Sequence, residues 1–268
     1  MEIKINARAK INLDLVVNGK DKWHKNLHDI TTTMVLLDDF YASLTFNINK
    51  SDGFISSFTV KGQNSQEWFT PIEKMVHLWS LERRTPVDVN LEIENPIPYC
   101  TGLGGMSSYI SSALSSLEEF YFNEIRTERG IDKLPLFKLM DMALQCGSDV
   151  PFFVSGATRA KVTGVGNVIT PEESKGRIPV LLHIPQYKMS TKDAYKELDD
   201  LKLNTFLDLP KNRQYHSYLT KTTENDRWQL SGSGSAFFIY NASADEIKLS
   251  GEEWTKKGIC AKLYYTVC

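Results

Sequence analysis

Apolar and polar residues alternate with a period of two along much of the first hundred positions. The stretch INARAKINLDLVV (5–17) has this pattern, and ITTTMVLLDDFYASLTFNI (30–48) continues it, with Asp38 and Asp39 expected to form a turn. VDVNLEIENPIP (87–98) alternates again until its prolines, which cannot donate a ladder hydrogen bond, end it. Alternation is typical of strands, so these segments predict a β-rich amino-terminal region.

The spacing becomes helical after the glycines of PIPYCTGLGGMSS (96–108). SSYISSALSSLEEFYFNEI (107–125) places apolar residues three and four positions apart, and Ser107 or Ser108 is the expected amino-terminal cap. LPLFKLMDMALQCG (134–147) predicts another helix, and Gly147 stands where a left-handed cap residue is favoured. A strand, a glycine-rich turn and a helix therefore follow one another here.

Strands and helices are mixed beyond about residue 158. IPVLLHIP (178–185) predicts a strand, STKDAYKELDDL (190–201) a helix with a serine cap, and SGSGSAFFIYN (231–241) a glycine turn that leads into a strand. At 268 residues the chain is long enough for two domains of ordinary size. The predicted fold class is α+β with two domains.

Composition and charge exclude several classes of function. The formal net charge is -2, so the chain lacks the basic excess of a nucleic-acid-binding protein. The four cysteines, Cys100, Cys146, Cys260 and Cys268, form no CxxC pair, which argues against a zinc site or a disulfide framework. The sequence shows neither the apolar core of a signal peptide nor an apolar run that would span a membrane. We therefore expect a cytoplasmic protein with no nucleic-acid or membrane partner.

The glycine-rich turn at 102–105 has two interpretations from the residues alone. Backbone N–H groups and the positive end of a helix dipole converge at such a turn, which favours an anion such as phosphate. A tight strand-to-helix connection without a ligand fits equally well. The dinucleotide pattern GxGxxG would need glycine where Ser107 stands, and the P-loop would need a lysine that is absent.

Four motifs in order narrow the choice: AKINLDLVVNG, IPYCTGLGGMSS, GSDVPFFVSGATRAKVTGVG and LSGSGSAFF. Together they resemble the GHMP kinase superfamily, and within it they look most like the 4-diphosphocytidyl-2-C-methyl-D-erythritol kinases of non-mevalonate isoprenoid biosynthesis. The resemblance implies an amino-terminal ATP-binding domain (1–158) and a ferredoxin-like carboxyl-terminal domain (159–268), with the active site in the cleft between them.

The resemblance also implies the catalytic residues. It makes Asp149 the general base that takes the proton of the acceptor hydroxyl, and Lys10 the cation beside it. On their own, an aspartate before VPFF is more typical of a helix or turn cap, and Lys10 of a solvated strand residue.

ATP, with Mg2+, is the phosphate donor that the resemblance implies. The matching loop residues are Pro98, Thr101, Gly102, Leu103, Gly104, Gly105, Ser107 and Ser108, and Ser107 or Ser108 would bind the metal ion. Gly232, Ser233 and Gly234 match the third glycine motif, although alone they would indicate a plain turn. This loop departs from the family pattern: Tyr99, Cys100 and Thr101 precede the glycines, Met106 replaces a glycine, and Tyr109 replaces Asp or Asn. The Met106 side chain would crowd the phosphates unless its backbone keeps negative φ.

The acceptor site that the resemblance implies would hold a small molecule bearing a cytidine diphosphate. Asn12, His28, Thr191 and Tyr195 match its substrate-binding residues, while Leu27 replaces an aromatic residue that covers one face of the cytosine. Two other functions stay open: a kinase of the same superfamily acting on another alcohol, and an ATP-binding protein without turnover. The chain is expected to be a monomer or a homodimer.

Overall fold

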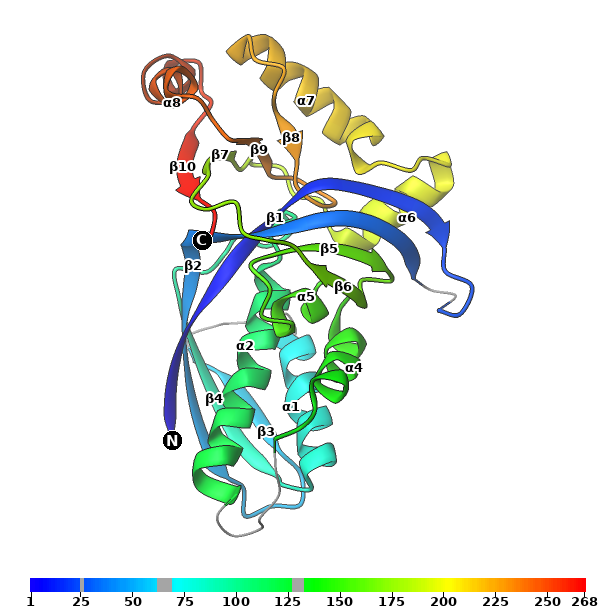
Figure 1. Ribbon diagram of the computed structural model, residues 1–268, viewed down its shortest axis with the longest axis vertical. Helices are drawn as coiled ribbons and strands as arrows, with labels where there is room; N and C mark the ends of the chain where they lie inside the picture. Colours follow the sequence, from blue (N-terminus) through cyan, green and yellow to red (C-terminus); the bar gives the residue numbers. More distant parts are fainter. Residues whose placement is uncertain (25–26, 62–68, 127–132) are drawn as a thin grey trace. The chain divides into compact units, whose positions relative to one another are not determined.

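The chain forms two compact units, each drawn from more than one stretch of sequence. This computed structural model describes residues 1–24, 27–61, 69–126 and 133–268. Unit 1 comprises Met1–Arg8, Tyr41–Ile97 and Gly105–Gly156, and unit 2 comprises Ala9–Phe40, Pro98–Gly104 and Ala157–Cys268. Strands β1 (Glu2–Lys20) and β2 (His28–Lys50) each contribute to both units (Figure 1). The division at residues 158 and 159 stays a prediction.

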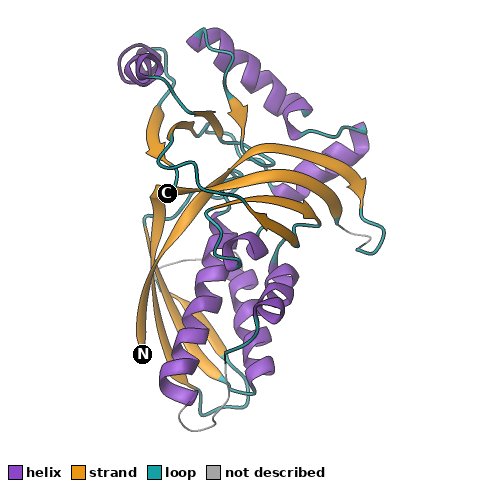
Figure 2. Cartoon of the chain, in the orientation of Figure 1, coloured by secondary structure: helices purple, strands orange, loops and turns teal. Residues whose placement is uncertain are grey.

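Unit 1 combines a sheet with a layer of helices. Its part of β2 pairs antiparallel with β4 (Val87–Glu94), from Ser43 opposite Glu94 to Lys50 opposite Val87, and β4 pairs parallel with β3 (Ser57–Val60). The helices are α1 (Thr70–Arg83), α2 (Gly105–Phe120) with a π-helical extension at Tyr121–Ile125, α4 (Leu136–Cys146) and α5 (Val150–Val154) (Figure 2). In this part of β2 the buried apolar residues Ala42, Leu44, Phe46 and Ile48 alternate with half-buried polar residues, so one face of the sheet contributes to the core.

A buried ion pair anchors α2 to α1. Arg83 donates from Nε to Glu118 Oε1 over 3.0 Å, and Trp79 Nε1 donates to the same oxygen over 2.7 Å. The Arg83 and Glu118 side chains are only 3% and 13% exposed. If the two helices separated, each charge would lose its partner. Since a buried charge without a partner is costly, this pair holds α2 against α1.

Unit 2 contains the other end of β1 and β2 and a second sheet. β2 pairs antiparallel with β5 (Arg159–Gly164), and β5 with β6 (Val168–Pro171). The second sheet has the order β10 (Ala261–Tyr265), β7 (Pro179–His183), β9 (Phe237–Tyr240) and β8 (Gln229–Leu230), with antiparallel neighbours. Its helices are α6 (Thr191–Leu201), a 3-10 turn at Phe206–Asp208, α7 (Pro210–Thr223) and α8 (Ala244–Leu249), which a π-helical turn at Ser250–Trp254 extends.

Most of the predicted elements are confirmed, and the α+β fold class with them. The predicted strands correspond to β1, β2, β4, β7 and β9, and the predicted helices to α2, α4 and α6. Ser190 caps α6 by accepting a hydrogen bond from the Asp193 N–H, as expected. Helices α1 and α7 were not predicted. In the described part of the chain, every helix is too short or too polar to cross a lipid bilayer.

Three local predictions are wrong. Asp38 and Asp39 form no turn, because β2 continues through them and Asp39 Oδ1 accepts a hydrogen bond from the Tyr265 N–H over 2.9 Å. Neither Ser107 nor Ser108 caps α2, because the helix begins earlier, at Gly105. Gly147 does follow α4, but its φ of 163° is extended rather than left-handed.

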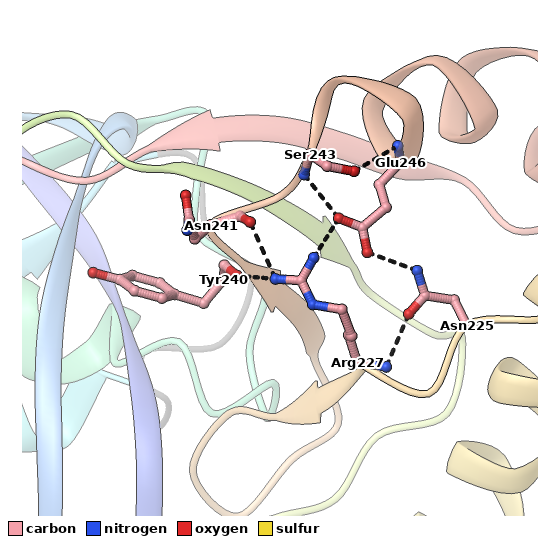
Figure 3. Close-up of polar contacts among 6 residues, drawn as sticks. All are labelled: Asn225, Arg227, Tyr240, Asn241, Ser243 and Glu246. Atoms are coloured by element: carbon pink, nitrogen blue, oxygen red, sulfur yellow. Dashed lines mark hydrogen bonds and ion pairs between the residues drawn. The ribbon is translucent and has the colours of Figure 1, made fainter.

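A polar cluster fixes the start of α8 in unit 2 (Figure 3). The Glu246 carboxylate accepts hydrogen bonds from the Ser243 N–H over 2.8 Å, from Asn225 Nδ2 over 2.7 Å and from Arg227 Nη1 over 2.6 Å. Burial opposes the charge of Glu246, but the hydrogen bonds from Ser243 and Asn225 and the charge of Arg227 outweigh it and hold the pKa of this carboxyl below its ordinary value. The ionised carboxylate is therefore the form that completes the helix cap.

We predict that Glu246→Gln lowers the free energy of unfolding at neutral pH by about 1–3 kcal/mol, because it removes the charge of a buried carboxylate that accepts three hydrogen bonds. Since the folded-state pKa of Glu246 is the lower one, its stabilisation is present above the ordinary value of 4.5 and is lost as pH falls through the folded-state pKa. Urea unfolding across this pH range should show the two proteins converging on acidification. Glu252→Gln, at an exposed glutamate, is the control; a pH-independent difference for Glu246→Gln would contradict the prediction.

Candidate functional site

Strand β1 brings Lys10 and Asn12 to the same face of unit 2. The two residues are two positions apart, and both are 2% exposed. Lys10 Nζ donates to Asn12 Oδ1 and, over 2.9 Å, to the carbonyl oxygen of Gly102. A buried ammonium group requires such partners, so Lys10 is not the solvated strand residue that the local pattern alone suggests.

The side-chain NH2 group and the backbone N–H of Asn12 also have hydrogen-bond partners. Its Nδ2 donates to Thr32 Oγ1 over 2.9 Å, and Thr32 in turn donates to the carbonyl oxygen of Asp14. Its backbone N–H donates to Ser231 Oγ over 3.3 Å. Asn12 therefore links β1 to β2 and to the glycine turn that begins at Ser231.

The first glycine turn, Pro98–Gly104, packs backbone to backbone against that second turn. Gly102 has a φ of 75°, and a Cβ placed on it would lie 1.9 Å from the carbonyl oxygen of Ser231. Ser231 Oγ donates to the Gly102 carbonyl over 3.0 Å, and the Ala236 N–H donates to the Thr101 carbonyl over 3.0 Å. The Lys10 N–H donates to the Leu103 carbonyl over 2.9 Å. Glycine is thus required at position 102 for a steric reason.

The second turn carries the residues of the third predicted motif. Gly232 and Gly234 have φ values of 58° and 93°, and Ser233 Oγ lies 3.4 Å from Thr191 Oγ1 at the start of α6. Asn212, which is fully buried in α7, donates from Nδ2 to the Ser233 carbonyl over 3.4 Å. Sequence reasoning missed Asn212, whose only local signal is a polar residue directly after LPK at the start of a helix.

His28 and Tyr195 come together near α6. Their rings stack with centroids 4.6 Å apart and planes inclined by 25°, and Tyr195 packs edge-on against Phe206. His28 Nε2 lies 2.8 Å from Asp199 Oδ1, and Lys20 Nζ lies 3.1 Å from Asp199 Oδ2. In this arrangement the two rings contact each other directly.

Asp199 was missed by the sequence reasoning. Its hydrogen bond with His28, together with that from Lys20, outweighs the effect of burial and holds the pKa of the Asp199 carboxyl below its ordinary value. Its position four residues after Tyr195 places both on one face of α6, but nothing in the local sequence indicates its contact with His28.

The remaining predicted residues lie in unit 1. Gly105 begins α2, and a Cβ on it would lie 2.9 Å from Ile97 Cβ. Ser107 and Ser108 follow in the first turn, where Ser108 is 3% exposed and Ser107 is half-buried. Tyr109, which departs from the family pattern, accepts a hydrogen bond from the Ile97 N–H over 2.7 Å and so ties α2 to the segment after β4.

Asp149 stands at the amino-terminal end of α5 without capping it. Its backbone is right-handed helical, with φ -87° and ψ -14°, and its side chain makes no cap hydrogen bond. A Cβ on nearby Gly147 would lie 3.9 Å from Ser107 Oγ. The turn that carries Asp149 therefore lies beside the first turn of α2.

Each unit thus gathers its own set of predicted residues. Unit 2 holds Lys10, Asn12, His28, Pro98, Thr101, Gly102, Leu103, Gly104, Thr191, Tyr195, Gly232, Ser233 and Gly234, and unit 1 holds Gly105, Ser107, Ser108 and Asp149. The predicted pairing of Lys10 with Asp149, and the roles of all these residues, stay predictions.

Comparisons with known proteins match this chain to the GHMP kinases. The profile of the GHMP kinases N terminal domain matches residues 72–157. A 4-diphosphocytidyl-2-C-methyl-D-erythritol kinase from Campylobacter jejuni subsp. doylei is 31% identical over 199 residues, which is 72% of each chain. Another, from Francisella tularensis subsp. holarctica, is 26% identical over 273 residues, 95% of this chain and 91% of the relative.

Solved structures share the fold. A crystal structure of 4-(cytidine 5'-diphospho)-2C-methyl-D-erythritol kinase matches with a TM-score of 0.70 at 20% identity, over 99% of this chain and 100% of that chain. A crystal structure of homoserine kinase from Cytophaga hutchinsonii matches with a TM-score of 0.62 at 11% identity, over 99% of this chain and 94% of that chain. At these identities the likeness shows the fold alone.

We predict that Gly102→Ala destabilises the protein far more than Gly156→Ala. Both glycines have a left-handed φ, of 75° and 74°, but a Cβ on Gly156 meets nothing within 4 Å. The control should lose about 1–2 kcal/mol of unfolding free energy from backbone strain alone. Gly102→Ala adds the collision with the Ser231 carbonyl, so its loss in a urea-unfolding measurement should be clearly larger. Equal losses would mean that the close approach is not required.

Proposed function

Since the chain belongs to the GHMP kinases, and within them to the 4-diphosphocytidyl-2-C-methyl-D-erythritol kinase family, we propose that it transfers the γ-phosphate of ATP to the 2-hydroxyl of 4-diphosphocytidyl-2-C-methyl-D-erythritol. The observation that carries this proposal is the convergence on the Gly102 carbonyl. Lys10 of the first motif and Ser231 of the last both donate to this oxygen, which belongs to the second motif. Three sequence motifs thus meet through hydrogen bonds.

The start of α2 suits the phosphates of ATP. A helix of sixteen residues presents unpaired N–H groups and the positive end of its dipole at Gly105. Phosphate oxygens are the anions that such helix ends bind, and a first residue without a side chain leaves the backbone accessible to them. We therefore assign the phosphate contacts to Gly105, Ser107 and Ser108.

Mg2+ fits the same place as a companion of the nucleotide. Among the described residues, no group of three or more His, Cys, Asp or Glu side chains gathers to hold a metal ion. Mg2+ commonly binds through phosphate oxygens and only one or two protein oxygens, and the hydroxyls of Ser107 and Ser108 supply oxygen. Of the two, half-buried Ser107 is the more accessible. When bound, the ion would neutralise charge on the phosphates.

Asp149 is the proposed general base. The turn that carries it lies beside the first turn of α2, to which the phosphate contacts are assigned. In the proposed step the acceptor hydroxyl gives its proton to Asp149 while its oxygen bonds to the γ-phosphorus, and the bond to the bridging oxygen breaks to release ADP. For Lys10 we propose the stabilisation of negative charge during this transfer.

The cytidine diphosphate part of the acceptor is assigned to Asn12, His28, Thr191 and Tyr195. The contacts among these residues support the assignment: Asn12 and Thr191 both approach the turn at 231–235, and His28 stacks on Tyr195. Stacking rings and hydrogen-bonding edges are the means by which proteins bind single bases. The cytoplasmic location and the oligomeric state stay predictions.

We predict that Asp149→Asn lowers kcat for phosphate transfer from ATP by about a hundredfold to ten-thousandfold, since the amide cannot take the proton. ATP affinity should change little, because the mutation keeps the shape of the side chain. Asp141→Asn, at an exposed aspartate of α4, is the matched control and should retain full turnover. Coupled ADP release and equilibrium ATP binding measure the two quantities. Wild-type turnover in Asp149→Asn would rule out the base.

We predict that CMP inhibits the reaction competitively against the acceptor. Only an acceptor with a cytidine group predicts such competition, so the result separates this substrate from homoserine, sugars or mevalonate. Initial rates at several CMP concentrations give the inhibition constant. Ribose 5-phosphate, which lacks the base, serves as the control, and equal inhibition by both compounds would contradict a cytidine site.

A further inference from the structure

A carboxylate, an imidazole and a phenol ring form a cluster in unit 2: the proposed function gives a role to His28 and Tyr195 but none to Asp199. The His28 side chain is 8% exposed, and its Nε2 lies 2.8 Å from Oδ1 of Asp199, which is 32% exposed. Lys20 Nζ lies 3.1 Å from the other carboxylate oxygen. One carboxylate therefore contacts both a cation and the histidine.

This contact dictates which nitrogen of His28 carries a proton. An ionised carboxylate only accepts hydrogen bonds, so the nitrogen that faces it has to be the donor. In a neutral imidazole one nitrogen donates and the other accepts, and the partner of the first nitrogen sets the tautomer. With Nε2 bound to Asp199, Nδ1 of neutral His28 is an acceptor.

The contacts of the His28 ring fix its orientation. Tyr195 stacks on it with centroids 4.6 Å apart, and Tyr195 is itself held edge-on by Phe206 at 4.8 Å. A half-turn about the Cβ–Cγ bond would keep the ring plane and its stack on Tyr195, but it would put Cε1 in place of Nε2 and so break the contact with Asp199. The orientation of the acceptor nitrogen is therefore fixed by side chains of α6 and of the 3-10 turn that follows.

We propose that Asp199 is a positioning residue that sets the base preference of the acceptor site, by holding His28 in the Nε2–H tautomer so that Nδ1 accepts a hydrogen bond from the 4-amino group of cytosine. The inference rests on the proposed function, because it requires a cytidine-bearing acceptor. Cytosine carries a donor at position 4, whereas uracil carries a carbonyl oxygen there. With uracil in the site, the acceptor nitrogen of His28 would face the carbonyl oxygen, and neither group would have a hydrogen bond. A site that loses a hydrogen bond in this way discriminates between two ligands more strongly than an apolar pocket does.

Asp199→Asn tests this directly. The asparagine amide can present either its oxygen or its NH2 group to Nε2, so both tautomers of His28 become compatible with the site. Asp200→Asn is the matched control: Asp200 is the next residue of the same helix, pairs with Lys196 on the surface and has no contact with His28 among the described residues. Thermal unfolding of each variant verifies that the fold is retained.

The readout is the ratio of the inhibition constants of UMP and CMP. We expect wild type and Asp200→Asn to prefer CMP by the same factor, and Asp199→Asn to lose about tenfold of that preference. The KM of the acceptor should rise in Asp199→Asn while kcat stays within about twofold of wild type. An unchanged UMP-to-CMP ratio in Asp199→Asn would overturn the inference, whereas failure of CMP to inhibit the wild type would overturn the proposed substrate itself.

A second measurement uses the unmodified protein. Nitrogen NMR of the chain labelled with 15N-histidine reports which ring nitrogen carries the proton, and a His28→Asn variant assigns the signal among the five histidines. At pH 8 the inference predicts a proton on Nε2 and none on Nδ1. A proton on Nδ1 would refute it, even if Asp199→Asn failed to fold.

Discussion

The close approach of two backbone turns is the constraint on which the candidate site in unit 2 depends. The Gly102 carbonyl accepts hydrogen bonds from Lys10 Nζ and from Ser231 Oγ, while its Cα faces the Ser231 carbonyl with no room for a side chain. Buried polar groups at such a contact have to find partners within the protein, and each does so in another motif. The positions of Lys10 and Asn12 follow from this arrangement.

The elements that the sequence predicts well are those with a strong local pattern. The alternation of β4 and the serine cap of α6 are both local, because burial on one face and one side-chain hydrogen bond decide them. The run through Asp38 and Asp39 is different. Local propensity favours a turn there, but pairing of Leu37 with Thr266 and the hydrogen bond to the Tyr265 N–H keep the strand extended. Residues more than two hundred positions away overrule the local preference.

The residues of the candidate site differ in the same way: some have a local sequence signal, and others are placed only by distant contacts. Ordered motifs allow Lys10, Gly102 and Ser233 to be chosen from the sequence, because each belongs to a run of residues whose order along the chain matches a known family. Asn212 and Asp199 cannot be found in this way. Their partners, Ser233 and His28, lie 21 and 171 positions away, and only the fold brings them into contact. Supporting residues of this kind orient the groups that touch ligands, and their sequence context is ordinary.

Met106 shows how the departures from the family pattern are accommodated. A residue in place of glycine matters where the backbone requires positive φ, as at Gly102 and Gly104, or where a Cβ would collide, as at Gly105. Met106 lies inside the first turn of α2 and is not among the positive-φ residues, so its backbone conformation is one that any side chain adopts. The neighbouring departure, Tyr109, gains a partner in the Ile97 N–H. Positions 102, 104 and 105 therefore keep glycine for a stated backbone or steric reason, whereas position 106 varies where neither reason applies.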